Sequence, residues 1–266
     1  MISPSTSSVD RAVFWDWDGT LAQRRATWNG CLLEILDRDH VGHGITPEGL
    51  RRFLRNGFPW HDHDEPHLDL CDPDAWWNAM TKTLSTALVG AGANTEVAWA
   101  VAEAARAQYV DPAAWSLFPD VRPALQMLAH EGWSHVILSN HVPELPCLVD
   151  SLGLTSLVHA TVSSAVTGYE KPHVEAYRAA LAAAGNPDRV WMVGDNPVAD
   201  VAGARAAGIP GILVRAPEFT DDYVAGITRS WAGSTGRWAG WRDAASRKAT
   251  DVAGAAQIIL ATVSAS

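Results

Sequence analysis

The chain has 266 residues, of which 47% are hydrophobic and 19% charged, which is enough apolar content for a large core and too much for a disordered protein. The formal net charge of −10 argues against nucleic acid and anionic membranes as partners, because the average field repels polyanions. Residues 1–11 lack the apolar run of a signal peptide, no segment resembles a membrane span, and the three cysteines are far apart, so we predict a cytoplasmic protein.

The first predicted element is a strand over residues 12–17, which reads AVFWDW and is followed by the turn sequence DGT. Asp16 and Asp18 stand at its end, where side chains two residues apart share a face. Each of these acids alone is typical of a turn. Together they would repel each other without a cation, so the pair favours a nucleophile and an acid–base group.

Residues 22–115 follow with mostly helical patterns, over 31–38, 47–54, 73–88 and 95–109. This composition predicts an inserted α-helical domain. Because the insert leaves the chain after the first acidic turn and returns near residue 118, we expect it to act as a lid over the strand ends.

Several aromatic residues and histidines of the insert could contact substrate, pack in the core or bind a metal. The loop at residues 58–61 is expected either to contact substrate or to anchor the helices, and Trp76, Trp77 and Trp99 are expected to pack in the core. Three histidines lie close together, but their spacing fits no known metal pattern, so we interpret them as part of a solvated polar loop: His61, His63 and His67.

The rest of the chain alternates apolar strands with helices. Strands are predicted at 135–138, 190–193 and 211–214, and helices at 121–131, 144–152, 173–184 and 198–207, each helix followed by a glycine. This order predicts an α/β fold with a Rossmann-like parallel sheet, whose ligands bind at the carboxyl ends of the strands. The predicted domains are a core of residues 1–21 and 116–266 and a helical domain of residues 22–115. The sequence does not place the Trp- and Arg-rich residues 218–248, and residues 251–260 suit a last strand or helix.

Four polar segments follow one another along the chain: DWDGT from Asp16, LSN from residue 138, GYEKP with Lys171, and GDNPVAD from residue 194. In order and spacing they resemble the four motifs of the haloacid dehalogenase superfamily, and the insert resembles the helical cap of its first cap class. One DxDGT is a weak signal, whereas four motifs in register are a strong one.

The resemblance implies a role for each matching residue. Asp16 would be the nucleophile that forms an aspartyl-phosphate, and Asp18 the general acid and later the base that activates water. Mg²⁺ would be held by Asp16, the backbone carbonyl of Asp18, and Asp195, with Asp200 supporting that shell or orienting Lys171. Donors to the phosphoryl group and supporting residues complete the set: Lys171, Ser139, Thr20, Asn140 and Asn196.

Asp18 bears on the type of reaction, because an alkoxide leaving group needs a proton and a halide does not. We therefore predict a magnesium-dependent phosphate monoester hydrolase, monomeric or homodimeric, that acts on a small phosphorylated metabolite. A phosphomutase or a 2-haloacid dehalogenase would share the fold, and a catalytically silent domain that binds a partner is the alternative from another class. His141 is expected to line the pocket or to cap the next helix. The sequence does not identify the substrate.

Overall fold

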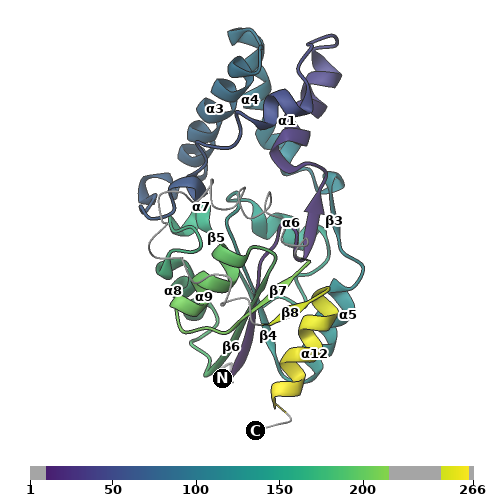
Figure 1. Ribbon diagram of the computed structural model, residues 1–266, viewed down its shortest axis with the longest axis vertical. Coiled ribbons are helices and arrows are strands. Elements are labelled where there is room, and N and C mark those ends of the chain that lie inside the picture. The colour runs from purple at the N-terminus through teal and green to yellow at the C-terminus, as the bar shows by residue number, and fades with distance from the viewer. Residues whose placement is uncertain (1–9, 216–246, 264–266) are drawn as a thin grey trace, which may run out of the picture.

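The computed structural model describes residues 10–215 and 247–263 (Figure 1). Its centre is a sheet of six parallel strands, in the spatial order β5 (Ala160–Ser163), β4 (Ser134–Ser139), β1 (Arg11–Trp15), β6 (Arg189–Gly194), β7 (Gly211–Val214) and β8 (Lys248–Ala249). The chain runs outward from β1 through β4 to β5, and then crosses to β6 on the other side of β1. The predicted Rossmann-like α/β core is confirmed, and its strand order reverses beside β1, where open α/β sheets bind ligands.

Helices cover both faces of this sheet. On one side lie α5 (Val121–His130) and α12 (Val252–Val263), and on the other α8 (Val174–Ala183) and α9 (Gly203–Ala206) (Figure 1). Alternate side chains of β1 enter two separate cores: Val13 and Trp15 join one, while Ala12 and Phe14 join the other. This double burial explains why β1 reads as an unbroken apolar run.

The register of the central strands brings their ends level. Trp15, the last residue of β1, pairs with Ile137 of β4 and Val193 of β6. The backbone N–H of Asp16 donates to the carbonyl of Val193 at 2.9 Å. The residues that follow β1, β4 and β6 therefore emerge at the same edge of the sheet.

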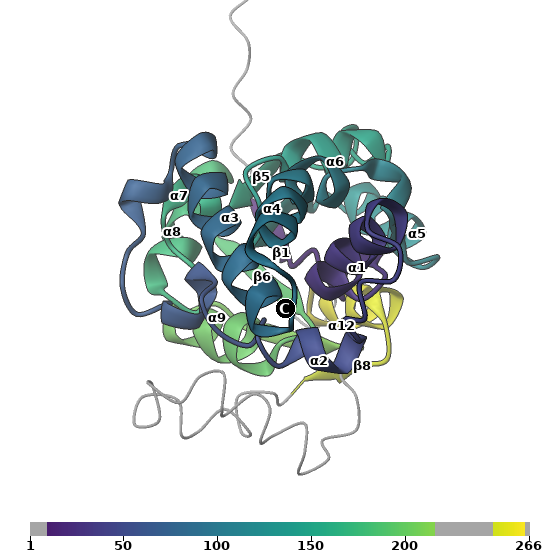
Figure 2. The ribbon, with the colours of Figure 1, turned by 90° about the horizontal axis from the view of Figure 1, so that it is seen from above.

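The inserted segment, residues 22–115, leaves and re-enters through the antiparallel strands β2 (Ala22–Arg24) and β3 (Trp115–Leu117). Its helices lie together beyond the carboxyl ends of the sheet, and Figure 2 shows them from above. They are α1 (Thr27–Asp39), α2 (Pro47–Arg51), α3 (Pro73–Gly90) and α4 (Thr95–Tyr109), with the short 3₁₀ turns η1 (Pro59–Asp62), η2 (Leu68–Leu70) and η3 (Pro112–Ala114). The division into two domains stays a prediction.

Aromatic rings form the centre of the inserted segment. Trp28 stacks on Tyr109, with ring centroids 4.0 Å apart, and also contacts Phe58, Trp76 and Trp77. All five side chains are buried. These rings join buried aliphatic residues of α1, α3 and α4 in one hydrophobic core.

Two carboxylates of the core fasten the inserted segment. Glu144, just before α6 (Leu145–Ser151), accepts hydrogen bonds from the indole N–H of Trp77 at 3.1 Å and from Arg106 Nε at 2.9 Å. Glu170, which follows α7 (Ser164–Thr167), lies 2.8 Å from His67 Nδ1. These contacts join the insert to the core on two sides of the strand ends.

Several predicted elements need correction. The helix predicted over 198–207 is divided into a wide helical turn, η4 (Pro197–Ala202), and α9. The last segment, predicted as a strand or a helix, is the helix α12. Trp99 was expected in the core, but it is 44% exposed on the outer face of α4. The histidine loop is not simply solvated, because His63 is buried. Of the Trp- and Arg-rich segment, residues 218–246 lie outside the described residues.

None of the helices within residues 10–215 and 247–263 is both long and apolar enough to cross a membrane. The three cysteines carry free thiols, as their spacing predicts.

Candidate active site

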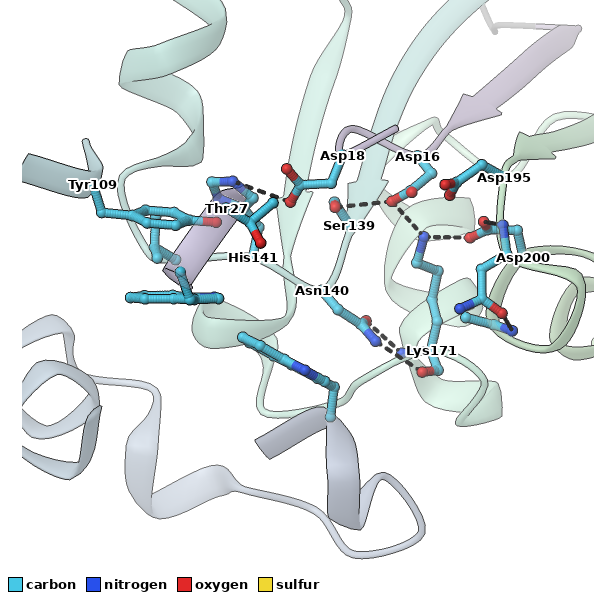
Figure 3. A pocket seen from close by; sticks show the side chains of 15 residues that line it. Asp16, Asp18, Thr27, Tyr109, Ser139, Asn140, His141, Lys171, Asp195 and Asp200 are labelled. Carbon is cyan, nitrogen blue, oxygen red and sulfur yellow. Dashed lines mark hydrogen bonds and ion pairs between the residues drawn. The ribbon is translucent and has the colours of Figure 1, made fainter. Parts of the chain in front are cut away.

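The carboxylate of Asp16 is held from two sides at the end of β1 (Figure 3). Ser139, the last residue of β4, donates its hydroxyl to Asp16 Oδ1 at 2.9 Å, and Lys171 Nζ donates to the same oxygen at 2.8 Å. The side chain of Asp16 is 9% exposed. Both donors engage Oδ1, so the orientation of the carboxylate is fixed and Oδ2 has no donor from this pair.

Lys171 is buried and forms a second ion pair, in which Nζ lies 2.5 Å from Asp200 Oδ1. Burial alone would lower the pKa of Lys171, but the charges of Asp16 and Asp200 outweigh it and raise that pKa above its ordinary value. Asn140 positions the lysine backbone: its amide donates to the Lys171 carbonyl at 2.8 Å and accepts from the Lys171 N–H at 2.7 Å. The lysine therefore stays charged and fixed.

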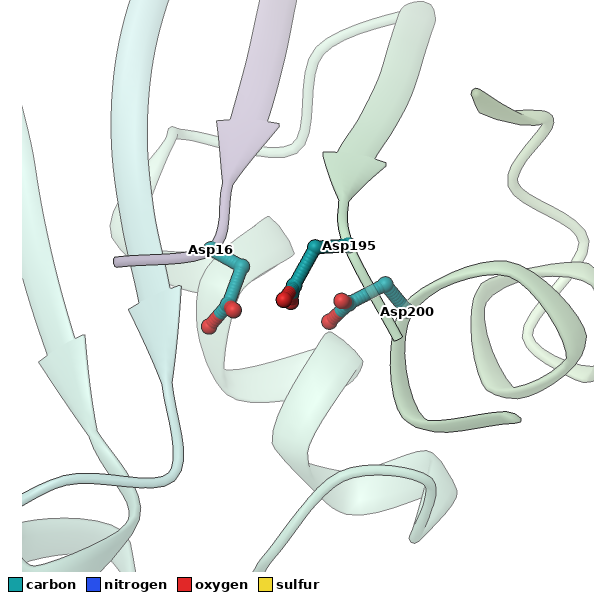
Figure 4. Close-up of side chains that lie close together, drawn as sticks. All are labelled: Asp16, Asp195 and Asp200. Carbon is teal, nitrogen blue, oxygen red and sulfur yellow. The ribbon is translucent and has the colours of Figure 1, made fainter. Parts of the chain in front are cut away.

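Three carboxylates lie close together beside the end of β6 (Figure 4). One oxygen each from Asp16, Asp195 and Asp200 can be chosen so that all three lie within 4.8 Å of one another. Burial, and then the charges of Asp16 and Asp200, raise the pKa of Asp195 well above its ordinary range. Such crowding is unfavourable without a cation, and three carboxylates are the hard oxygen donors that Mg²⁺ prefers. The residues present therefore fit a divalent cation.

Gly19 allows this approach. Its φ is +73°, which favours glycine, and a Cβ built there would collide with the Asp195 carboxylate. The turn after Asp18 therefore has to lack a side chain for Asp195 to reach its place.

Asp18 faces His141 across the cavity. Its Oδ2 lies 3.6 Å from His141 Nε2, beyond hydrogen-bond distance, and its Oδ1 is buried with no partner among the described residues. Burial, and then the charge of Asp16, raise the pKa of Asp18 to about 8. Burial lowers the pKa of His141 to about 3, so this imidazole is neutral at physiological pH. Asp18 thus differs from Asp16, which is bonded to Lys171, as a carboxyl group that holds a proton.

These side chains share one cavity of about 310 Å³, to which core and insert both contribute. The inserted segment supplies four of its walls: Thr27, Trp28, Trp60 and Tyr109. The core supplies the remainder: Asp16, Asp18, Ser139, Asn140, His141, Val142, Lys171, Asp195, Asn196, Ala199 and Asp200. A volume of this size suits a small ligand.

All but one of the residues predicted from the four motifs therefore meet in this cavity. The exception is Thr20, which is fully buried and does not line it; its carbonyl accepts from Arg215 Nε at 3.2 Å. Asn196 lines the cavity and also caps η4, accepting at 3.0 Å from the N–H groups of Val198 and Ala199. The roles of these residues stay predictions.

The sequence analysis did not single out five of the lining residues: Thr27, Trp28, Tyr109, Val142 and Ala199. Tyr109 ends a helical apolar pattern, which indicates only packing, and Trp28 lies just before the pattern predicted over residues 31–38. His141 was expected to line the pocket or to cap a helix, and it lines the cavity. Trp60, from the loop considered for substrate contact or for anchoring the helices, lines the cavity and stacks on Phe58 with centroids 4.6 Å apart. Substrate contact stays a prediction.

Comparison with known proteins agrees with this site. The family model described as "haloacid dehalogenase-like hydrolase" matches residues 11–208. The human haloacid dehalogenase-like hydrolase domain-containing protein 3 is 24% identical over 220 residues, 80% of this chain and 85% of the relative. A phosphoserine phosphatase of Thermus thermophilus is 35% identical over 136 residues, 48% of this chain and 54% of its own. The structure of L-2-haloacid dehalogenase from Xanthobacter autotrophicus superimposes with a TM-score of 0.60 at 20% identity, covering 94% of this chain and 98% of that one. With the matched residues forming one cavity at the strand ends, the chain belongs to the haloacid dehalogenase-like hydrolases.

Proposed function

We propose that the protein is a magnesium-dependent phosphate monoester hydrolase that acts on a small phosphorylated metabolite. The observation that carries this proposal is the second carboxyl group, Asp18, which shares the cavity with Asp16 and whose Oδ1 is buried without a hydrogen-bond partner among the described residues. A halide leaves without a proton, so this group has a use with an alkoxide leaving group and none with a halide.

Asp16 and Asp195, with the backbone carbonyl of Asp18, would hold Mg²⁺, and Asp200 would support them through its closeness to both carboxylates. When bound, the ion supplies positive charge that offsets the charge on the phosphate oxygens.

The remaining steps belong to the chain's own residues. Oδ2 of Asp16 attacks phosphorus, while the bond between phosphorus and the ester oxygen breaks and Asp18 gives its proton to that oxygen. Asp18, now a carboxylate, removes a proton from water, which attacks the aspartyl-phosphate and releases inorganic phosphate and Asp16. Lys171 and Ser139 hold Oδ1 of Asp16 throughout, which keeps Oδ2 aimed at the substrate.

The inserted segment would serve as the cap domain of this hydrolase. It contributes the cavity walls opposite the strand ends, and the bonds of Glu144 and Glu170 hold it there. A closed cap excludes bulk water from the phosphoryl group, which strengthens the contacts of Lys171 with charged oxygens.

The relatives support this function in part. The phosphoserine phosphatase matches about half of this chain, while the dehalogenase shares its fold at an identity too low to indicate a reaction. Experiment therefore has to distinguish hydrolysis of phosphate esters from dehalogenation.

The test is release of phosphate from p-nitrophenyl phosphate with Mg²⁺ and with EDTA, beside release of chloride from 2-chloropropionate. We expect turnover of the ester only with Mg²⁺ and none of the chloride. Asp16→Asn should abolish turnover, whereas Asp37→Asn, which changes a carboxylate that is 74% exposed, should leave it intact. Chloride release, or ester turnover that survives Asp16→Asn, would refute the proposal.

A further inference from the structure

The cavity has two chemically different sides. Figure 3 shows Tyr109, Thr27 and His141 on one side of Asp18, and Lys171, Asp195 and Asp200 on the other. A proton donated by Asp18 has to reach the ester oxygen, so the phosphoryl group occupies the Lys171 side. The leaving alcohol therefore extends into the Tyr109 side, which we call the leaving-group pocket: Thr27, Trp28, Trp60, Tyr109, His141 and Val142.

No charged side chain lines the leaving-group pocket within the described part of the molecule. Its one imidazole, that of His141, is buried, and neither ring nitrogen has a hydrogen-bond partner among the described residues. The buried guanidinium of Arg24 does not line this cavity: it lies over the Tyr109 ring, 5.7 Å from the ring centroid, and is paired with Glu34 at 2.6 Å. A second anionic group on the substrate would meet no cation there and would face Asp18 in a low-dielectric site.

Cations do lie nearby, but on the far side of an aromatic wall. A second cavity, of about 340 Å³, shares Thr27, Trp28 and Trp60 with the first and is lined by the exposed Arg51 and Arg55. Trp60 stacks on Phe58 and, with centroids 6.5 Å apart, on Trp28. These stacked rings separate the arginines from the leaving-group pocket.

We infer that the enzyme selects monoesters whose leaving alcohol is uncharged and presents a flat apolar face, with Trp60 as a specificity-determining residue. This inference rests on the proposed hydrolysis of phosphate esters. The stacked rings favour such an alcohol by burying it, and the same rings keep a carboxylate or second phosphate near the ester away from Arg51 and Arg55.

Two matched pairs of esters test this selectivity with Mg²⁺ present. Phosphoglycolate and its amide, 2-amino-2-oxoethyl phosphate, have nearly the same shape and differ in one charge; we expect kcat/KM to be at least about tenfold higher for the amide. Benzyl phosphate carries a phenyl ring where ethyl phosphate carries a methyl group. We expect kcat/KM to be about 10- to 100-fold higher for benzyl phosphate.

The outcomes separate the two proposals. If phosphoglycolate equals or exceeds its amide, or ethyl phosphate equals benzyl phosphate, while both esters are hydrolysed through Asp16, the inference on selectivity is wrong and the hydrolase stands. If no ester of the four and no p-nitrophenyl phosphate is hydrolysed, the proposed function fails and the inference fails with it.

Substitution of Trp60 tests the residue itself. Trp60→Ala should bring both ratios close to one, because it removes the stacking ring and opens the wall toward Arg51 and Arg55. Trp60→Phe should keep both ratios, and Trp99→Ala, which removes an exposed indole from α4, should leave them unchanged. Each ratio compares two esters on one sample, so partial loss of folded protein cancels. Unchanged ratios in Trp60→Ala would show that Trp60 does not determine this specificity.

Discussion

Glu170 Oε2 lies 2.8 Å from His67 Nδ1, so the residue next to Lys171 in the sequence is bonded to the inserted segment. The backbone N–H of His67 also donates to the carbonyl of Gly168 at 2.8 Å. Two hydrogen bonds thus join the loop that carries Lys171 to the loop that carries His67. We expect a movement of one loop to displace the other.

The pair of His67 and Glu170 is expected to make the free energy of unfolding depend on pH. The hydrogen bond with Glu170 is the main cause that raises the pKa of His67 above 6.5, helped by Asp62 and Asp69 and opposed by burial. A raised pKa means that the charged pair stabilises the fold fully below pH 6.5 and that this contribution is lost as pH rises through the raised value. His67→Asn keeps a donor without the charge. We expect the difference in free energy of unfolding between wild type and His67→Asn, below about 1 kcal/mol, to be larger at pH 6 than at pH 9 in urea titrations. A difference that is constant with pH would contradict this.

Gly19→Ala tests whether the close approach of Asp195 to Asp16 matters for activity. The new methyl group would displace the Asp195 carboxylate, so we expect magnesium-stimulated hydrolysis to fall by at least about 100-fold. Gly42→Ala is the matched control, because Gly42 also has a positive φ, +83°, but nothing lies within 4 Å of its Cβ position. Both variants should lose about 1 kcal/mol from backbone strain, and only Gly19→Ala should lose activity. Equal activity in the two variants would show that Asp195 is not needed.

Asp18→Asn should affect poor leaving groups most. Without the proton, hydrolysis of an alkyl phosphate should fall by about 10²- to 10⁴-fold in its first step. p-Nitrophenolate leaves without help, so its ester should still form the aspartyl-phosphate and give a rapid burst near one equivalent per enzyme, followed by slow turnover. Stopped-flow absorbance measures the burst. Steady turnover of p-nitrophenyl phosphate at the wild-type rate would assign the acid–base role to another group.

Glu144→Ala should loosen the inserted segment. It leaves the buried indole N–H of Trp77 without its acceptor and frees Arg106, at a cost of about 1–2 kcal/mol. Asp74 also binds Arg106, at 2.9 Å, but its side chain is 82% exposed, so Asp74→Ala should cost less than about 0.5 kcal/mol. We expect KM for p-nitrophenyl phosphate to rise in Glu144→Ala and to stay near wild type in Asp74→Ala. A larger change in Asp74→Ala would reverse the assignment.

The sequence predicts the core well where a strand is apolar and ends in polar residues. The strands over residues 12–17, 135–138 and 190–193 are found at β1, β4 and β6, and their terminal acids and Ser139 meet as expected. β5 and β8 were not predicted, because a strand of four residues reading ATVS and one of two residues carry too weak a pattern.

The cavity walls were harder to foresee. The pairing of Trp77 with Glu144 spans 67 residues and that of His67 with Glu170 spans 103, and such contacts depend on how the insert docks rather than on any local pattern. For the same reason Trp77 and Trp99, both in predicted helical stretches, could not be told apart, although one is buried and the other is exposed.

The ion pair between Asp16 and Lys171 joins residues 155 positions apart, and Asp200 lies further along still. During synthesis β1 leaves the ribosome long before β6 and η4 exist, so Asp16 stays without Lys171, Asp195 and Asp200 until those later residues have been made. If the site works as proposed, a nascent chain that ends before residue 171 would lack the lysine and both of the acids that complete it.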